Sequence, residues 1–134
     1  MPEHSSYDYA IIRVVPRVER GECINVGIIL FCRTQTFLGT LTHMDTPRLL
    51  ALAPDLDLEA VRQQLELITL TCKGASETGK IGQMSLAERF HWLVSPRSTI
   101  IQISPVHCGL CSDPAFALQR LFQKMVATSV PSRG

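Results

Sequence analysis

Alternation of apolar and polar residues dominates the first third of the chain and predicts three β-strands. The alternation runs through residues 7–18, 23–33 and 36–43. The first two runs are separated by Glu19-Arg20-Gly21, which suits a three-residue hairpin loop with Gly21 in the left-handed conformation. We therefore expect the chain to open with a three-stranded meander.

The hairpin loop also predicts how the first two strands pair. With Gly21 at the turn, Arg17 lies opposite Cys23 and Arg13 lies opposite Gly27, so that the apolar faces of both strands share one side of the sheet. The polar side chains then collect on the other side. They include Arg13, Arg17, Glu22 and Asn25.

After the third strand the apolar spacing changes to three and four, which predicts helices. The strongest amphipathic stretch runs over residues 57–72, a capping box begins at Ser85, and Asp113 caps a last helix. A short helix at 49–53 and a late strand at 99–104 complete the order. Because most strands precede most helices along the chain, we expect an α+β fold. It should have an antiparallel or mixed four-stranded sheet and three to four helices packed mainly on one face.

Length and composition favour a single domain over residues 1–134. A chain of 134 residues usually forms one hydrophobic core, and a content of 46% hydrophobic and 19% charged residues is typical of globular proteins. Residues 1–6 and 129–134 are expected to be flexible tails. Residues 74–84 carry several glycines without apolar periodicity, so we expect a flexible loop there.

Charge and cysteine content limit the classes of partner. Thirteen Lys plus Arg against twelve Asp plus Glu give a net charge of +1, so nucleic acid is not an expected partner. The longest apolar run, residues 26–32, is too short to cross a bilayer. Five cysteines without an export signal are typical of reduced thiols, and we expect a cytoplasmic location.

Residues 74–81, Gly-Ala-Ser-Glu-Thr-Gly-Lys-Ile, have the glycine and lysine spacing of a phosphate-binding P-loop. That motif needs Ser or Thr after the lysine to hold magnesium, but Ile81 follows Lys80. It also needs a preceding strand, whereas a helix is predicted here. We therefore expect an ordinary surface loop and no nucleotide cofactor.

Cys108 and Cys111 have C-x-x-C spacing, directly after His107. Such a pair can begin a zinc site or act as a redox pair. A structural zinc site usually has a second close pair of ligands, and the other cysteines stand singly at positions 23, 32 and 72. No metal is predicted, and the sequence leaves a redox role open.

Arginines supply the candidate binding residues, because a planar guanidinium suits bidentate contact with carboxylate or phosphate. Arg13, Arg17, Glu22 and Asn25 share the non-core side of the predicted hairpin, and Arg97 precedes the late strand. The alternative is a solvated sheet face on which the arginine stems cover apolar neighbours.

Several stretches resemble the bacterial family called domain of unknown function 3037. They are the hairpin over residues 9–31, then residues 95–98 and 104–107, and Leu121-Phe122, so that the resemblance covers nearly the whole chain. The family has no established activity, and no site residue can be carried over from it. Its members often sit beside a HipA-type kinase, so the resemblance implies such a kinase as a partner or regulator.

These observations lead to two functional hypotheses. The first is a non-catalytic cytosolic module that binds a protein partner, with a HipA-type kinase as the candidate, through the face of Arg13, Arg17 and Asn25. The second is a small enzyme or nucleic-acid-processing subunit in which the arginines, with Glu22, hold phosphate. No hydrolase motif with a nucleophile beside its base occurs, so no catalytic residue is assigned. The oligomeric state stays open.

Overall fold

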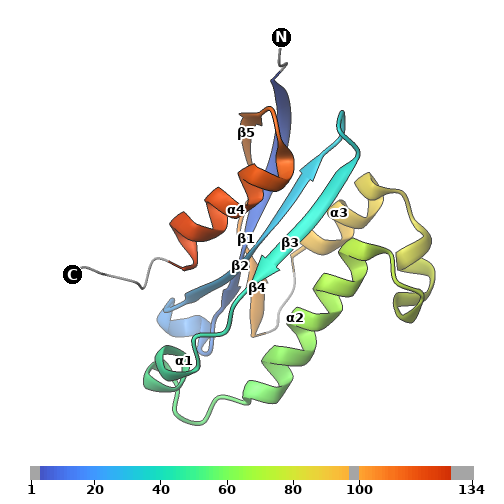
Figure 1. Cartoon of the computed structure of the whole chain (residues 1–134). Helices are drawn as coiled ribbons and strands as arrows, with labels where there is room; N and C mark the ends of the chain where they lie inside the picture. The colour runs from blue at the N-terminus through green and yellow to red at the C-terminus, as the bar shows by residue number, and fades with distance from the viewer. Residues whose placement is uncertain (1–3, 97–99, 128–134) are drawn as a thin grey trace.

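The computed structural model describes residues 4–96 and 100–127. Within them one antiparallel sheet contains five strands in the order β3-β2-β1-β4, with β5 also paired to β1 (Figure 1). The strands are β1 (Ser5–Val14), β2 (Ile24–Cys32), β3 (Phe37–Thr42), β4 (Ile101–Ile103) and β5 (His107–Cys111). The predicted α+β class and the opening meander are confirmed.

The fifth strand corrects the prediction of one late strand. β4 and β5 follow one another along the same edge of β1 and are separated at Ser104. The Ile11 amide donates to the Ser104 hydroxyl oxygen at 2.8 Å, and the Ser104 amide donates to the Ile11 carbonyl at 2.9 Å. The sequence of β5, His-Cys-Gly-Leu-Cys, has no β-branched residue, and its pattern therefore did not indicate a strand.

Four α-helices and two 3-10 segments make up the rest of the regular structure in the described part of the chain. They are α1 (Thr46–Leu52), α2 (Leu58–Lys73), α3 (Leu86–Val94), α4 (Pro114–Met125), η1 (Val18–Arg20) and η2 (Ser76–Gln83). The caps follow the sequence pattern: the carboxylates of Asp45, Asp57 and Asp113 accept first-turn amides, and Ser85 forms a capping box with Glu88. None of these helices is long and apolar enough to cross a membrane.

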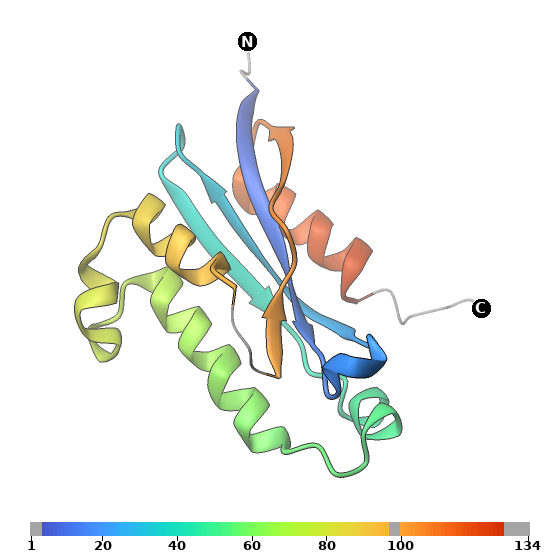
Figure 2. The same cartoon turned by 180° about the vertical axis from the view of Figure 1, so that it is seen from behind.

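The helices cover both faces of the sheet. In Figures 1 and 2, α2 and α3 lie on one side of the strands and α4 lies on the other. Leu49 of α1, Leu65 of α2 and Phe90 of α3 share one apolar cluster with Ile12, whereas Leu118 of α4 packs in a second cluster. Three of the four described helices thus share one face, in agreement with the prediction of helices mainly on one face, and α4 lies on the other.

A β-bulge in β2 changes which residues of this strand face each cluster. Ile12 pairs with Gly27, but the next residue of β1, Arg13, pairs with Asn25, so Val26 is an extra residue. As a result Val26 lies under α2 and α3. Beyond the bulge, Ile28 lies under α4. The predicted register, with Arg13 opposite Gly27, is wrong. Arg13 pairs with Asn25 on the turn side of the bulge, because the connection between the two strands is longer than the prediction assumed.

The connection between β1 and β2 is longer than the predicted three-residue loop. β1 ends at Val14, β2 begins at Ile24, and η1 lies between them. Gly21 does have the predicted left-handed conformation, with a φ of 71°. Pro16, which lacks an amide hydrogen, is in keeping with the early end of strand pairing.

The predicted tails and loop fall partly outside the described residues. Ser5 and Ser6, expected in a tail, belong to β1, and residues 129–134 lie outside the described ranges. The loop predicted at 74–84 contains η2 and follows α2, with Gly74 ending that helix at a φ of 70°. The P-loop-like residues thus follow a helix, as expected, and not the strand that a P-loop requires.

Candidate functional site

The predicted arginine face is covered by α4 and does not form one surface. Arg13 and Asn25 are paired across β1 and β2. The Asn25 side-chain amide donates to the Met125 carbonyl at the end of α4, at 3.1 Å. Arg17 is exposed in the connection that follows β1, where its Nη2 lies 3.6 Å from Asp55 Oδ1. The structure therefore brings Arg13 and Asn25 together and places Arg17 elsewhere.

Of the two remaining predicted residues, only Glu22 is among the described ones, and it lies apart from that pair. Glu22 is in the same connection as Arg17, and its Oε2 accepts from Arg20 Nη2 at 3.0 Å. Arg97 lies outside the described residues. No single arginine-lined pocket is thus assembled from these positions in the described part of the chain.

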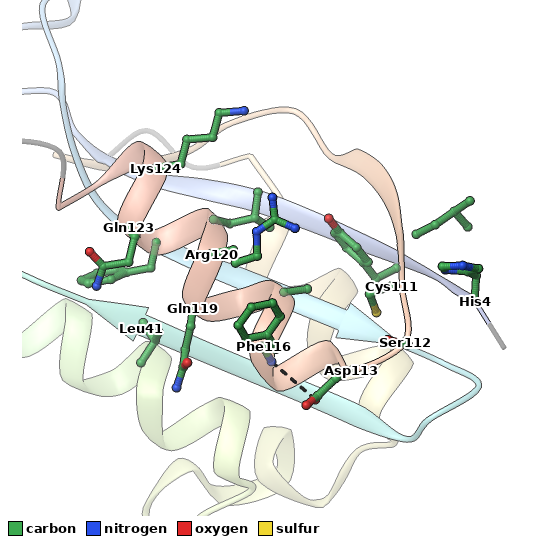
Figure 3. Close-up of a pocket in the computed structure, with 15 residues that line it drawn as sticks. His4, Leu41, Cys111, Ser112, Asp113, Phe116, Gln119, Arg120, Gln123 and Lys124 are labelled. Atoms are coloured by element: carbon green, nitrogen blue, oxygen red, sulfur yellow. Dashed lines mark hydrogen bonds between the residues drawn. The ribbon is translucent and has the colours of Figure 1, made fainter. Parts of the chain in front are cut away.

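A groove beside α4 is the best candidate site that the structure contains (Figure 3). It has a volume of about 1040 Å³ and lies between α4 and neighbouring parts of β1, β3 and β5. Aromatic, aliphatic, thiol and cationic side chains line it together, among them Tyr7, Leu110, Cys111, Phe116, Arg120 and Lys124.

Two apolar side chains at this groove are unusually exposed. Leu110 of β5 is 69% exposed and Phe116 of α4 is 57% exposed, the highest values among the large hydrophobic residues of the described ranges. Phe116 lies beside the inward stripe of α4, whose Ala117 and Leu118 are buried. The helix can therefore pack on the sheet without covering the Phe116 ring.

Phe116, Arg120 and Lys124 are spaced four residues apart and form one row along α4. In Figure 3 the side chains of Arg120 and Lys124 point to the same side of the helix, whereas Gln119 points to the other side, toward Leu41. The row therefore combines one aromatic ring with two cationic groups.

The opposite wall of the groove depends on Gly109 of β5. Gly109 pairs with Tyr7 of β1, and a Cβ at this glycine would collide with the Tyr7 hydroxyl. The ring of Tyr7 thus lies across β5 where a larger residue would displace it. Burial raises the pKa of Tyr7, the nearby Tyr9 and Cys111 add to this, and the positive charge of Arg120 opposes it.

The C-x-x-C pair does not act as a pair of neighbouring thiols. Cys108 and Cys111 are three residues apart on β5 and therefore point to opposite faces. Cys111 is buried in the cluster that contains Cys32, and Cys108 is exposed opposite Asp8. Among the described residues no group of three or more His, Cys, Asp or Glu side chains could hold a metal ion.

The cysteines differ in their expected reactivity. The hydrogen bond that the Cys108 thiol donates to Asp8, together with the negative charge of that carboxylate, raises the pKa of Cys108, and burial raises the pKa of Cys72 to about 12. Since only the thiolate attacks iodoacetamide, we expect Asp8→Asn to lower the pKa of Cys108 and to speed its alkylation at pH 8. Mass spectrometry of the modified peptides over time measures this rate.

The other cysteines serve as internal controls for this labelling. The rate at Cys23, which is exposed, should be the same in both proteins, and Cys72 should stay unmodified while the protein is folded. An unchanged Cys108 rate in Asp8→Asn would show that the carboxylate does not control this thiol.

Sequence reasoning missed the groove, of which only one wall was visible in the sequence. The positions of Phe116, Arg120 and Lys124 at intervals of four were visible in the sequence, and Phe116 lies outside the buried stripe of α4. Tyr7 and Cys111, by contrast, meet there only because β5 pairs with β1, and β5 was not predicted. One wall of the groove was thus open to prediction and the other was not.

The fold and the groove define a small α+β domain, with an antiparallel sheet covered on both faces and an apolar and cationic groove beside its last described helix. The chain belongs to the family described as protein of unknown function DUF3037, whose model matches residues 9–126. The match includes Phe116, Arg120 and Lys124, and Tyr7 precedes it. Searches of curated proteins and of solved structures find no significant match.

Proposed function

We propose that this domain is a non-catalytic protein-interaction module whose partner binds in the groove beside α4. The exposure of the Phe116 ring at that groove carries the proposal. Exposed apolar groups with a polar rim are typical of protein interaction sites, and here Arg120 and Lys124 supply the rim. Aromatic residues at such positions commonly provide much of the binding free energy.

The family resemblance makes a HipA-type kinase the first partner to test. Arg17 and Glu22 stay candidate contacts outside the groove, and Arg97 stays a candidate contact. The phosphate-binding alternative has less support, because Arg13 lies on the face that α4 covers. Arg17 lies next to Asp55, which follows α1 on the other face.

The test is recovery of a HipA-type kinase from the same genome on the immobilised domain. Phe116→Asp places a charge where the partner's apolar surface would be buried, and it should lower the affinity at least about thirtyfold, as expected for loss of an aromatic hot spot worth about 2 kcal/mol or more. Isothermal titration calorimetry with the purified kinase gives the affinity.

Leu67→Asp is the matched control. Leu67 is an exposed apolar residue, 47% exposed, on α2 and on the other face of the sheet. This variant should bind the kinase as the wild type does, and both variants should keep the wild-type thermal midpoint. Equal affinities of all three proteins for the kinase, or no binding by any of them, would contradict the proposal.

A further inference from the structure

We propose that the groove binds an extended, acidic segment of the partner, with one apolar side chain on Phe116 and carboxylates at Arg120 and Lys124. This inference rests on the proposed function, because it specifies the chemistry of the partner at the same site. It draws on the spacing of the row on α4, on the charges around the groove and on the open edge of the sheet.

The spacing of the row matches an extended peptide. Residues four apart on a helix are separated by about 6 Å along its axis. Alternate residues of an extended chain point to the same side and are about 6.7 Å apart. A segment lying along α4 can therefore place three alternate side chains against Phe116, Arg120 and Lys124 in turn. The ligand sequence that fits this spacing has an apolar residue with carboxylate residues two and four positions before or after it.

The charges of the groove favour carboxylates over basic groups. Arg120 and Lys124 are both exposed, so either can reach a ligand without first breaking a buried contact. Asp113 is the one carboxylate among the described residues that line the groove. Its Oδ1 accepts the amides of Ala115 and Phe116 at the start of α4, and this capping role occupies it. An acidic segment in the groove is therefore attracted by two cationic side chains, and the one carboxylate there is already hydrogen-bonded to the helix.

The neighbouring edge of the sheet favours an extended conformation over a helix. β5 pairs with β1 and forms part of one edge of the described sheet, next to the groove. No Lys, Arg, Asp, Glu or Pro occurs within His107–Cys111, although charged residues and proline are the usual means of protecting an edge from another strand. Leu110, on this edge, is the most exposed large hydrophobic residue of the described ranges.

The experiment is selection of peptides on the immobilised full chain from a random dodecapeptide display library. We expect the selected peptides to carry an aromatic or aliphatic residue with Asp or Glu two and four positions away. Their affinity, measured by fluorescence anisotropy, should fall at least tenfold for Arg120→Glu/Lys124→Glu. Selection on that double variant should return Lys or Arg at the same two positions.

Arg48→Glu/Lys80→Glu is the matched control. Both residues are exposed, on α1 and η2, and this variant changes the net charge by the same amount at a distance from the groove. It should bind the acidic peptides nearly as the wild type does. An equal loss in both double variants would show a non-specific effect of net charge and would overturn the inference.

The outcomes separate this inference from the proposed function. If Phe116→Asp abolishes kinase binding but the selected peptides show no acidic preference, the proposed function is supported and the inference of an acidic ligand is overturned. Carboxylates spaced by four and eight residues would indicate a helical ligand and would overturn the extended conformation. A wild-type dimer that Phe116→Asp converts to a monomer would identify the occupant as a second copy of the chain and would overturn the inference, as would a selection that enriches no peptide.

Discussion

Replacing Arg89 with alanine is expected to lower the free energy of unfolding by about 3 kcal/mol, because two strong hydrogen bonds and a buried stem are lost together. Arg89 is 9% exposed. Its Nη1 donates to the Thr71 and Cys72 carbonyls, both at 3.0 Å. These carbonyls are at the end of α2, where the helix dipole favours a positive charge. The side chain thus holds α3 against α2.

Urea unfolding followed by circular dichroism measures this change. Arg89→Lys should restore only part of the loss, since an ammonium group is more strongly hydrated than a guanidinium and costs more to bury. Arg62→Ala is the control: Arg62 is exposed on α2 and pairs with Glu59, so its loss should cost less than about 1 kcal/mol. A difference of less than about 1 kcal/mol between Arg89→Ala and wild type would mean that the contact with α2 contributes little.

Replacing Gly27 with valine is expected to destabilise the domain by about 2 to 3 kcal/mol, the usual range for overpacking in a core. A Cβ at this position would lie 2.9 Å from the Ile12 Cδ1 and 2.9 Å from the Leu41 carbonyl oxygen. The Ile12 side chain can adjust its rotamer. The carbonyl belongs to the backbone of β3. The clash with it can be removed only if β3 shifts away from β2, and this shift would weaken the pairing at the bulge.

Ser6→Val is the control for Gly27→Val, because it introduces the same β-branched residue at an exposed position of β1. It should change the free energy of unfolding by less than about 0.5 kcal/mol. Urea midpoints of both variants are compared with that of the wild type. A Gly27→Val protein as stable as Ser6→Val would argue against close packing of β2 at the bulge.

Local interactions explain why the helices could be predicted. Asp57, Ser85 and Asp113 cap their helices through bonds to amides two or three residues away, so the signal is contained in a few consecutive residues. The left-handed Gly21 is similar, because its conformation depends on the absent side chain of that residue alone. The wrong length of the loop around it came from assuming that strand pairing continued past Val14.

The two faces of the sheet were harder to predict, because apolar residues occur at nearly every position of β2. Such a run indicates burial on both sides, but the polar residues Arg13 and Asn25 suggested a solvated face. In the structure Asn25 supports the end of α4 through the Met125 carbonyl. This polar side chain is therefore not solvated: it contacts a helix residue that lies 100 positions later in the chain.

The sequence by itself determined the order of the α-helices and of β1 to β4, the helix caps and the turn glycine, since each depends on neighbours in the chain. Tertiary structure alone decided the bulge at Val26, the pairing of β5 with β1 and the placement of α4 on the second face. These depend on contacts between residues far apart in sequence, which no local period encodes. The candidate groove arises from the same contacts, because Phe116 on α4 and Cys111 on β5 line it together with Tyr7 only when β5 pairs with β1 and α4 packs on the second face of the sheet.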